Sequence, residues 1–307
     1  MKKFIKSSVV FILLLILGGE LIIRVNHVMS DIPQREINEF GIQKYIPNQL
    51  GYWKGGEHQW LINRLGWPGQ LPKSYNNLVT IIGDSFIENF MNPNECHQSV
   101  LLKQKVDDFN FIEAGRSGVS FIEAMEISKQ LDSLNPEYHL IYVSKQDFIE
   151  SVADIEPLND ITQVNLKANK IEYGVMKSPS LKKVLYNFKL LYYCYTNFSL
   201  QFPTSKNVEK QEKITKNNQF VKNRKEILQL VTYVKSNYKI NNKVLIFHPK
   251  TEFKIIEICQ NLGFKTMILN SDNDKSWTFK HDHHWTCYGH NRVAEQVASF
   301  LQNEVIH

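Results

Sequence analysis

The sequence predicts an α/β protein built around a parallel sheet, and three observations lead to this fold class. Several short apolar runs have the length and composition of strands that are buried on both faces of a sheet. Amphipathic segments with helical spacing of apolar residues stand between these runs. The two kinds of segment alternate along much of the chain, which implies helices on both faces of one parallel sheet.

Five apolar runs are the expected strands of this sheet. The first ends in glycine, as suits a buried strand that leads into a turn. In chain order the runs are LVTIIGDS (78–85), FNFIEAG (109–115), HLIYVS (139–144), KVLIFHP (243–249) and KTMIL (265–269).

Four helices are expected between and after these strands. The helix over 120–131 has Ser120 and Glu123 in the positions of a capping box, and an Asn-Pro pair follows its end. The other three helices are expected at 225–238, at 255–264 and at about 288–303.

Two regions interrupt the alternation. Residues 26–75 are irregular and contain Trp53, Trp60 and Trp67, which either stack on sugar rings or pack as a hairpin on the main domain. Residues 151–222 are rich in lysine and asparagine and contain the aromatic stretch YNFKLLYYCYTNF. This second region indicates an insertion or a lid.

Residues 1–25, MKKFIKSSVVFILLLILGGELIIRV, predict a membrane-spanning helix. Lysines precede an apolar stretch that approaches the roughly 20 residues a bilayer requires. A cleaved signal peptide is the alternative, but no small-x-small cleavage site follows the apolar run, which favours an uncleaved anchor. The lysines are expected in the cytoplasm, which places the rest of the chain in the periplasm or outside the cell.

Composition limits the choice of partner. The 307 residues carry a net charge of +5, with lysine and arginine scattered among acidic residues. Nucleic-acid binding requires basic residues to cluster, so no nucleic-acid partner is expected.

The cysteines are predicted to be free and packed. They are widely spaced and form no CxxC pair, so a zinc site through paired cysteines is not expected. A location outside the cytoplasm permits disulfides, but a domain of this size does not need them. The four are Cys96, Cys194, Cys259 and Cys287.

Gly83-Asp84-Ser85 directly follows the first expected strand. In parallel α/β sheets, ligands bind beyond the carboxyl ends of the strands. A serine at this turn lies near a helix N-terminus, where partial positive charge favours an oxyanion. A simple helix N-cap is the structural alternative.

The stretch HDHHWTCYGH (281–290) places four histidines and an aspartate close together near the last helix. A serine hydroxyl needs a base near neutral pH, histidine has a suitable pKa, and a carboxylate on its other ring nitrogen fixes the tautomer. A metal site through His281, His283, His284 or His290 is the alternative. It lacks a second cluster of ligands, so no metal is expected.

Four blocks of the sequence resemble the SGNH (GDSL) hydrolase superfamily, in the order and spacing of that family. The resemblance implies a three-layer α/β/α sandwich with a five-stranded, flavodoxin-like parallel sheet at 76–307, interrupted by the insertion at 151–222. It implies no cofactor. The blocks are TIIGDSF, FIEAGRSGVS, LIYVSKQDF and DHHWTCYGHNRVAEQVASFL.

The resemblance assigns roles to individual residues. Ser85 is the expected nucleophile, His284 the base and Asp282 the carboxylate that orients it. The family commonly has Asp-x-x-His, whereas this chain has Asp-x-His followed by Trp-Thr, which is similar to alginate-type O-acetyltransferases. His283 is the second choice of base, because adjacent side chains in an extended loop point in opposite directions.

The resemblance also implies an oxyanion hole made by the backbone N–H groups of Ser85 and Gly115 and by a side-chain amide. Gln146 stands where the family has asparagine, and Lys145 precedes it. One such donor contributes roughly 3 kcal/mol of transition-state stabilisation. Asp84 and Asp147 are expected to stabilise their turns.

The predicted function is therefore that of a serine esterase acting on ester-linked acyl groups. The substrate expected of an outward-facing enzyme is an O-acetylated carbohydrate of the envelope or the exterior, and no further substrate-binding residues are identified. A carbohydrate O-acetyltransferase with the same triad is one alternative. A non-catalytic glycan-binding or assembly protein on the same fold is another, kept open by the departures at Lys145 and Gln146.

Overall fold

The computed structural model describes residues 1–198 and 219–305 of the chain. Its centre is a five-stranded sheet, order β11-β10-β7-β5-β6, in which every pair of neighbours is parallel. Counted along the chain this is the order 2-1-3-4-5 of flavodoxin-like folds. The strands are β5 (Leu78–Gly83), β6 (Asn110–Gly115), β7 (Tyr138–Val143), β10 (Lys243–Phe247) and β11 (Lys265–Ile268).

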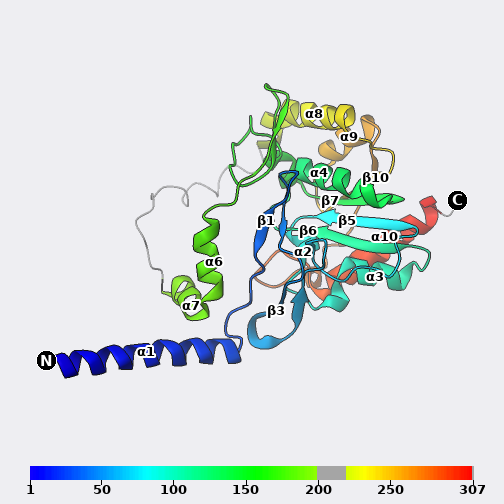
Figure 1. Ribbon diagram of the computed structural model, residues 1–307. Helices are drawn as coiled ribbons and strands as arrows, with labels where there is room; N and C mark the ends of the chain where they lie inside the picture. The colour runs from blue at the N-terminus through cyan, green and yellow to red at the C-terminus, as the bar shows by residue number, and fades with distance from the viewer. Residues whose placement is uncertain (199–218, 306–307) are drawn as a thin grey trace.

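Helices cover both faces of the sheet, so the predicted three-layer sandwich is confirmed (Figure 1). One face carries α4 (Phe121–Leu131), α8 (Gln219–Asn237) and α9 (Phe253–Asn261). The other carries α3 (Gln98–Lys105) and α10 (Cys287–Val305). Strands β5, β7 and β10 are buried along nearly their whole length, which explains their continuous apolar sequences.

The start of α4 differs in one detail from the capping box expected there. The Ser120 hydroxyl accepts a hydrogen bond from the Glu123 backbone N–H at 3.3 Å, as predicted. The Glu123 side chain does not return to the cap but forms a buried ion pair with Arg116 at 2.7 Å. A buried guanidinium requires a charged partner, and this requirement takes precedence over the second half of the box.

Residues 26–75 form two small hairpins, β1 (Arg35–Ile37) with β2 (Gln43–Tyr45) and β3 (Leu50–Tyr52) with β4 (Gln59–Leu61). Trp60 and Trp67 are buried, so these two tryptophans pack against the domain. The ring of Trp60 lies so close to Gly51 that a Cβ there would be 2.2 Å from it. For Trp60 and Trp67, the structure therefore agrees with the alternative in which the aromatic side chains pack on the main domain.

The described part of the insertion contains four elements. The hairpin of β8 (Gln163–Asn165) and β9 (Lys170–Glu172) is followed by α6 (Pro179–Asn187) and α7 (Lys189–Asn197). The β8–β9 hairpin joins the main core, because Val164 of β8 is fully buried beneath α4 and its neighbours. Helices α6 and α7 lie away from the sheet, beside the N-terminal helix (Figure 1).

That N-terminal helix, α1 (Lys2–Val25), is long and apolar enough to cross a membrane, as a membrane anchor or a signal sequence would be. Almost none of its apolar stretch is buried within the protein.

The prediction of four free cysteines is wrong for one pair. Cys96 and Cys287 form a disulfide with their Cα atoms 5.1 Å apart, whereas Cys194 and Cys259 are free. The two partners are 191 residues apart in sequence. They meet because α3 packs along α10, and a packing contact between distant helices leaves no local sequence pattern.

Candidate active site

Ser85 lies where β5 ends, at the carboxyl edge of the sheet. Gly83 is the last residue of the strand, and Asp84 caps the short helix α2 (Ser85–Glu88) by accepting a hydrogen bond from the Phe86 N–H at 3.0 Å. A Cβ on Gly83 would lie 2.6 Å from the side chain of Ile87, so α2 can fold back on the strand only over a glycine.

The structure brings Ser85, His284 and Asp282 together. The Nε2 atom of His284 lies 2.7 Å from the Ser85 hydroxyl oxygen. The Nδ1 atom of the same ring is hydrogen-bonded to the Asp282 carboxylate, which also accepts the His284 backbone N–H at 2.9 Å. The backbone N–H of His284, followed by its ring, lowers the pKa of the Asp282 carboxyl, although desolvation acts in the opposite direction.

The neighbouring histidines have other positions. His281 and His283 are exposed, and only His284 of the HDHH run contacts Ser85 among the contacts of the described chain. His290 is buried and its backbone carbonyl accepts a hydrogen bond from Gln98 at 2.8 Å. Within residues 1–198 and 219–305, no group of three or more His, Cys, Asp or Glu side chains is placed to hold a metal ion.

Aromatic rings surround His284. The ring of Phe86 lies 5.0 Å from that of His284 and 4.8 Å from that of Trp285. Trp285 is buried, and its backbone carbonyl accepts a hydrogen bond from the Asn92 amide at 2.9 Å. These contacts fix the loop that carries His284 and exclude water from one side of the imidazole.

His248 is a site residue that was not predicted from the sequence. It follows β10, is 7 % exposed, and packs with its ring 4.4 Å from that of Phe86. Its Nε2 atom has no hydrogen-bond partner among the described residues. Burial, followed by the nearby His284, lowers the pKa of His248 to about 3, so this imidazole is neutral near pH 7. Its place at the carboxyl end of a predicted strand was the signal that would have identified it.

Asp84 and Asp147 hold their turns as expected. Asp147 accepts the Ser144 backbone N–H at 2.6 Å and completes a capping box at the start of α5 (Lys145–Glu150). Burial raises the pKa of Asp84 to about 6. Burial, and then the charge of Asp84, also raise the pKa of Asp147.

Gly115 and Gln146, the two other residues expected in the oxyanion hole, make other contacts in the structure. Gly115 is the last residue of β6 and is covered by α2, because a Cβ there would lie 2.5 Å from the Glu88 amide nitrogen. The amide of Gln146 is exposed and donates to Glu150 at 2.9 Å, and within the described chain it makes no hydrogen bond to Ser85 or His284. Lys145, the other departure from the family pattern, forms an ion pair with Glu252 at 2.8 Å.

Two pockets border the segments that position this site. The first, here called the histidine pocket, has a volume of about 760 Å³. It is lined by Phe86, His248 and Trp285 on its apolar side and by the loop that contains Asp282 and His283.

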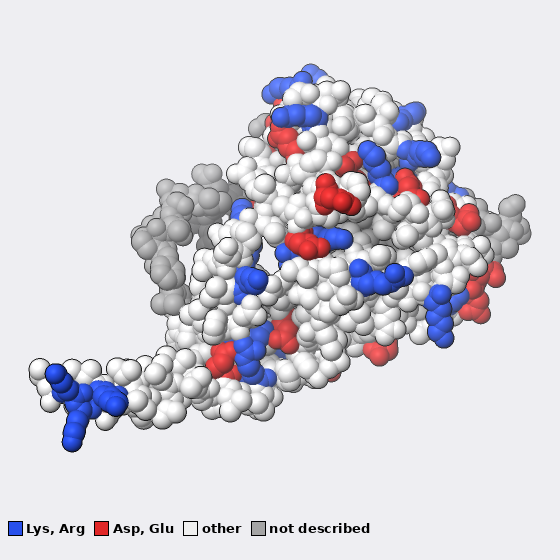
Figure 2. All heavy atoms as spheres, viewed as in Figure 1, with Lys and Arg blue, Asp and Glu red and all other residues white. Residues whose placement is uncertain are grey.

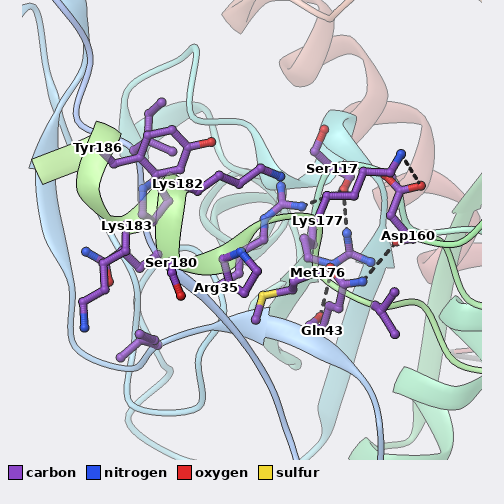
Figure 3. Close-up of a pocket in the computed structure, with 18 of the residues that line it drawn as sticks. Arg35, Gln43, Ser117, Asp160, Met176, Lys177, Ser180, Lys182, Lys183 and Tyr186 are labelled. Carbon is purple, nitrogen blue, oxygen red and sulfur yellow. Dashed lines mark hydrogen bonds and ion pairs between the residues drawn. The ribbon is translucent and has the colours of Figure 1, made fainter. Parts of the chain in front are cut away.

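The second, here called the basic pocket, has a volume of about 550 Å³, and Figure 3 shows the residues that line it. It is lined by β1, by the turn after β6 and by α6, and Asp160 is the acidic member among its described lining residues. Its basic residues are Arg35, Arg116, Lys177, Lys182 and Lys183.

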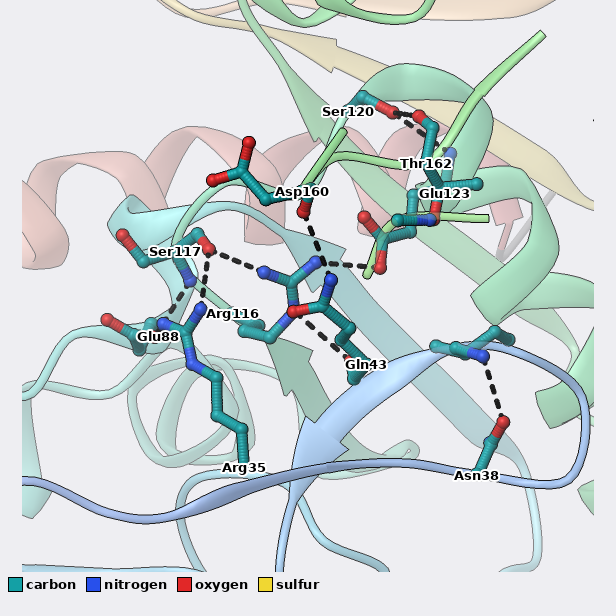
Figure 4. Close-up of polar contacts among 12 residues, drawn as sticks. Arg35, Asn38, Gln43, Glu88, Arg116, Ser117, Ser120, Glu123, Asp160 and Thr162 are labelled. Atoms are coloured by element: carbon teal, nitrogen blue, oxygen red, sulfur yellow. Dashed lines mark hydrogen bonds and ion pairs between the residues drawn. The ribbon is translucent and has the colours of Figure 1, made fainter. Parts of the chain in front are cut away.

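A polar network connects the basic pocket to α2 (Figure 4). The Glu88 carboxylate accepts the Ser117 N–H at 2.7 Å and the Tyr45 hydroxyl, and lies 3.5 Å from the Arg35 guanidinium. Glu88 is one helical turn from Ser85, so the carboxylate-bearing residue that the pocket residues Arg35 and Ser117 contact lies about 5 Å along the helix axis from the serine position.

The two arginines of this network differ. Arg116 is buried, pairs with Glu123, and donates to the Gln43 carbonyl at 3.1 Å, so it has a structural role. The contacts of Arg35 are long, 3.4–3.5 Å, and its side chain is one-third exposed. Arg35 is therefore held less tightly than Arg116.

Comparison with known proteins adds limited information. The chain matches no protein-family model and no curated protein. It is similar to a solved lipolytic protein of the G-D-S-L family from Desulfitobacterium hafniense (14 % identity, TM-score 0.36, covering 73 % of this chain and 99 % of that one). It is also similar to TesA (9 % identity, TM-score 0.38, covering 74 % of this chain and 98 % of that one). A third similar structure is that of a family two carbohydrate esterase from Clostridium thermocellum (12 % identity, TM-score 0.37, covering 80 % of this chain and 67 % of that one). At such identities and TM-scores these likenesses do not decide the function, so the function is inferred from the geometry around Ser85.

Proposed function

We propose that the protein is a serine esterase in which Ser85 is the nucleophile, His284 the general base and Asp282 the residue that orients the base. The observation that supports this most directly is the pair of contacts made by the two ring nitrogens of His284. One lies 2.7 Å from the Ser85 oxygen and the other is bonded to Asp282. This arrangement gives the imidazole the tautomer that a general base requires.

In the proposed reaction, the Ser85 oxygen attacks the acyl carbon while His284 Nε2 takes the hydroxyl proton. The tetrahedral intermediate collapses when the imidazolium returns that proton to the departing alcohol oxygen, and an acyl-serine remains. Water then attacks this ester, again losing its proton to His284, and the acid leaves as Ser85 is restored. Asp282 stays ionised throughout and stabilises the imidazolium.

The Ser85 backbone N–H, at the start of α2, is the proposed first donor to the oxyanion. Gly115 and Gln146 are the further donors that the family resemblance implies. Gln146 must leave Glu150 before its amide can act in this way, which agrees with apo sites whose catalytic contacts form only with substrate.

The proposed substrate is an O-acetylated carbohydrate outside the cytoplasm. Helix α1 supports this location, and so does the Cys96–Cys287 disulfide, because such bonds persist in oxidising compartments.

A second candidate function is acyl transfer to a carbohydrate hydroxyl. It is favoured by the presence of two pockets, since transfer needs a place for the acyl donor and another for the acceptor. The histidine pocket adjoins the base, and the basic pocket is connected to the same helix that begins with Ser85.

The test is labelling of the full-length protein with a serine-reactive fluorophosphonate, compared with Ser85→Ala. We expect labelling and aryl-acetate hydrolysis in the wild type and neither in the variant. A folded wild type that does not react would favour the non-catalytic glycan-binding role instead. Faster turnover in the presence of a polysaccharide acceptor would favour transfer over hydrolysis.

A further inference from the structure

Helix α7 is attached to α1 by specific contacts. The Glu20 carboxylate of α1 accepts the backbone N–H groups of Lys189 and Leu190 at 3.0 and 2.7 Å. It thereby satisfies donors that the first turn of α7 would otherwise leave unpaired. Arg24, which pairs with Glu20, donates to the carbonyl of Asn187.

Close packing accompanies these hydrogen bonds. A Cβ on Gly19 would lie 3.2 Å from the side chain of Leu190, so the two helices approach each other over a glycine. A cleaved signal sequence would have no use for such contacts with the mature domain. They favour the interpretation of α1 as a retained anchor.

An apolar stripe runs along the exposed side of α6 and α7. Its members recur every three or four residues, which places them along one face of each helix, and each is between 44 and 66 % exposed. They are Leu181, Val184, Phe188, Leu191, Tyr195 and Phe198. Exposed apolar surface of this extent marks an interaction site.

The position of the stripe along α1 indicates that lipid covers it. Helix α7 begins beside Gly19 and Glu20, about 9 Å along the axis from the end of α1 at Val25. The other end of α1 carries the three lysines, and no charged residue lies between Lys6 and Glu20 (Figure 2). If α1 spans the bilayer with its lysines inside, the start of α7 is at the level of the outer lipid headgroups.

We propose that α1 remains attached to the protein and that the α6–α7 hairpin lies in the outer interface of the bilayer, with its apolar stripe covered by lipid. Aromatic and aliphatic residues on one side and lysines on the other are typical of interfacial helices. The opposite side of α6 contributes Lys182, Lys183 and Tyr186 to the basic pocket. The hairpin would therefore hold this pocket at the membrane surface. This inference does not depend on the proposed enzymatic activity.

The experiment uses the full-length protein in phosphatidylcholine nanodiscs, in a Cys194→Ser background that leaves the disulfide intact. Spin labels are attached at Leu191→Cys and Tyr195→Cys, with Lys183→Cys and Lys235→Cys as controls on the pocket side of α6 and on α8. We expect the first two labels to collide several-fold more often with lipid-soluble oxygen than with a water-soluble nickel chelate, and the controls to show the reverse.

Two outcomes would overturn the position of the hairpin. Labels at 191 and 195 that behave like the one at 235 would place the stripe in water. Labels shielded from both reagents would mean that protein covers the stripe, for example a second copy of the chain.

The anchor is tested separately by the intact mass of the native chain extracted from membranes, which is expected to include residues 1–25. A shorter mass would overturn retention of α1. Glu20→Ala is expected to reduce the oxygen preference at position 191 while the protein still floats with membranes. Leu21→Ala, an exposed neighbour on the same helix, is the matched control and is expected to leave that preference unchanged. An unchanged oxygen preference in Glu20→Ala would show that the contact between Glu20 and the start of α7 does not hold the hairpin in the interface.

Discussion

The histidine pocket and the basic pocket are both connected to α2, but they are built in different ways. Most of the histidine pocket comes from one stretch of chain, 271–285, to which the turn after β10 adds His248. The basic pocket combines β1, the turn after β6 and helix α6, which are far apart in sequence. The difference teaches that a short motif can identify a loop of candidate catalytic residues, whereas no motif identifies a pocket assembled from distant segments.

The largest expected effect separates two adjacent histidines of the loop that borders the histidine pocket. His284→Gln removes the base that contacts Ser85, and we expect kcat/KM for an aryl acetate to fall by about 10³–10⁴-fold. His283→Gln, in the exposed neighbour, is expected to change it less than about threefold. Steady-state kinetics of both purified variants provide the check, and equal losses would mean that the loop has a different arrangement during turnover.

The next effect concerns the disulfide, which lies next to the catalytic loop and not in the basic pocket. Cys287 is three residues after His284, and Cys96 ties it to the turn before α3. Replacing both cysteines by alanine is expected to lower the free energy of unfolding by roughly 3–5 kcal/mol, since the closed loop is long.

Urea titrations of the oxidised wild type and of this double variant measure the change. The Cys194→Ala variant, in a free cysteine, is the control and is expected to stay within about 1 kcal/mol. A double variant as stable as the wild type would show that packing of α3 on α10 suffices without the covalent bond.

The fold and the two pockets also show which features could be predicted from the sequence. The five strands, their parallel arrangement and the proximity of Ser85, His284 and Asp282 were predictable, because buried strands have continuous apolar sequences and the motifs stand at strand ends. The contacts of Gln146 were not, since a longer side chain on the first turn of a helix can bond to Glu150 four residues on. Nor was the basic pocket, because only the folded insertion brings α6 to β1.

A smaller, pH-dependent effect is expected at Asp84, which caps α2, the helix to which both pockets are connected. Burial raises its pKa to about 6, so the folded protein binds this proton more tightly than the unfolded chain does. The contribution of Asp84 to the free energy of unfolding should therefore fall as the pH rises from about 4 to about 6. Asp84→Asn keeps a capping oxygen and removes this dependence, a difference of roughly 2–3 kcal/mol between pH 4 and pH 7.

Asp282 provides the control of opposite sign. Its pKa is lowered, chiefly by the His284 backbone N–H, so its contribution to stability is present above its unfolded pKa and is lost as the pH falls through its folded pKa. Relative to Asp282→Asn, the wild type should gain stability with rising pH, whereas relative to Asp84→Asn it should lose it. Urea titrations from pH 2 to pH 7 would reveal both trends, the Asp282 trend below about pH 4 and the Asp84 trend between about pH 4 and pH 6, and trends of the same sign would contradict the assignment.

The smallest effect tests whether the basic pocket takes part in acyl transfer. Arg35 is the basic residue there that is both loosely held and close to Glu88 of α2. If the pocket holds an acceptor with negative charge, Arg35→Gln should reduce the acceleration by an anionic polysaccharide about three- to tenfold. Hydrolysis of an aryl acetate in water, which needs no acceptor, should change less than twofold.

Lys235→Gln on α8, far from both pockets in sequence and outside their linings, is the matched control for loss of one positive charge. An equal loss of both activities in Arg35→Gln would instead mean that Arg35 positions Glu88 and, through it, the helix that begins with Ser85. In that case the basic pocket would act on the proposed reaction only by holding α2, and with it Ser85, in place, and it would not bind an acceptor.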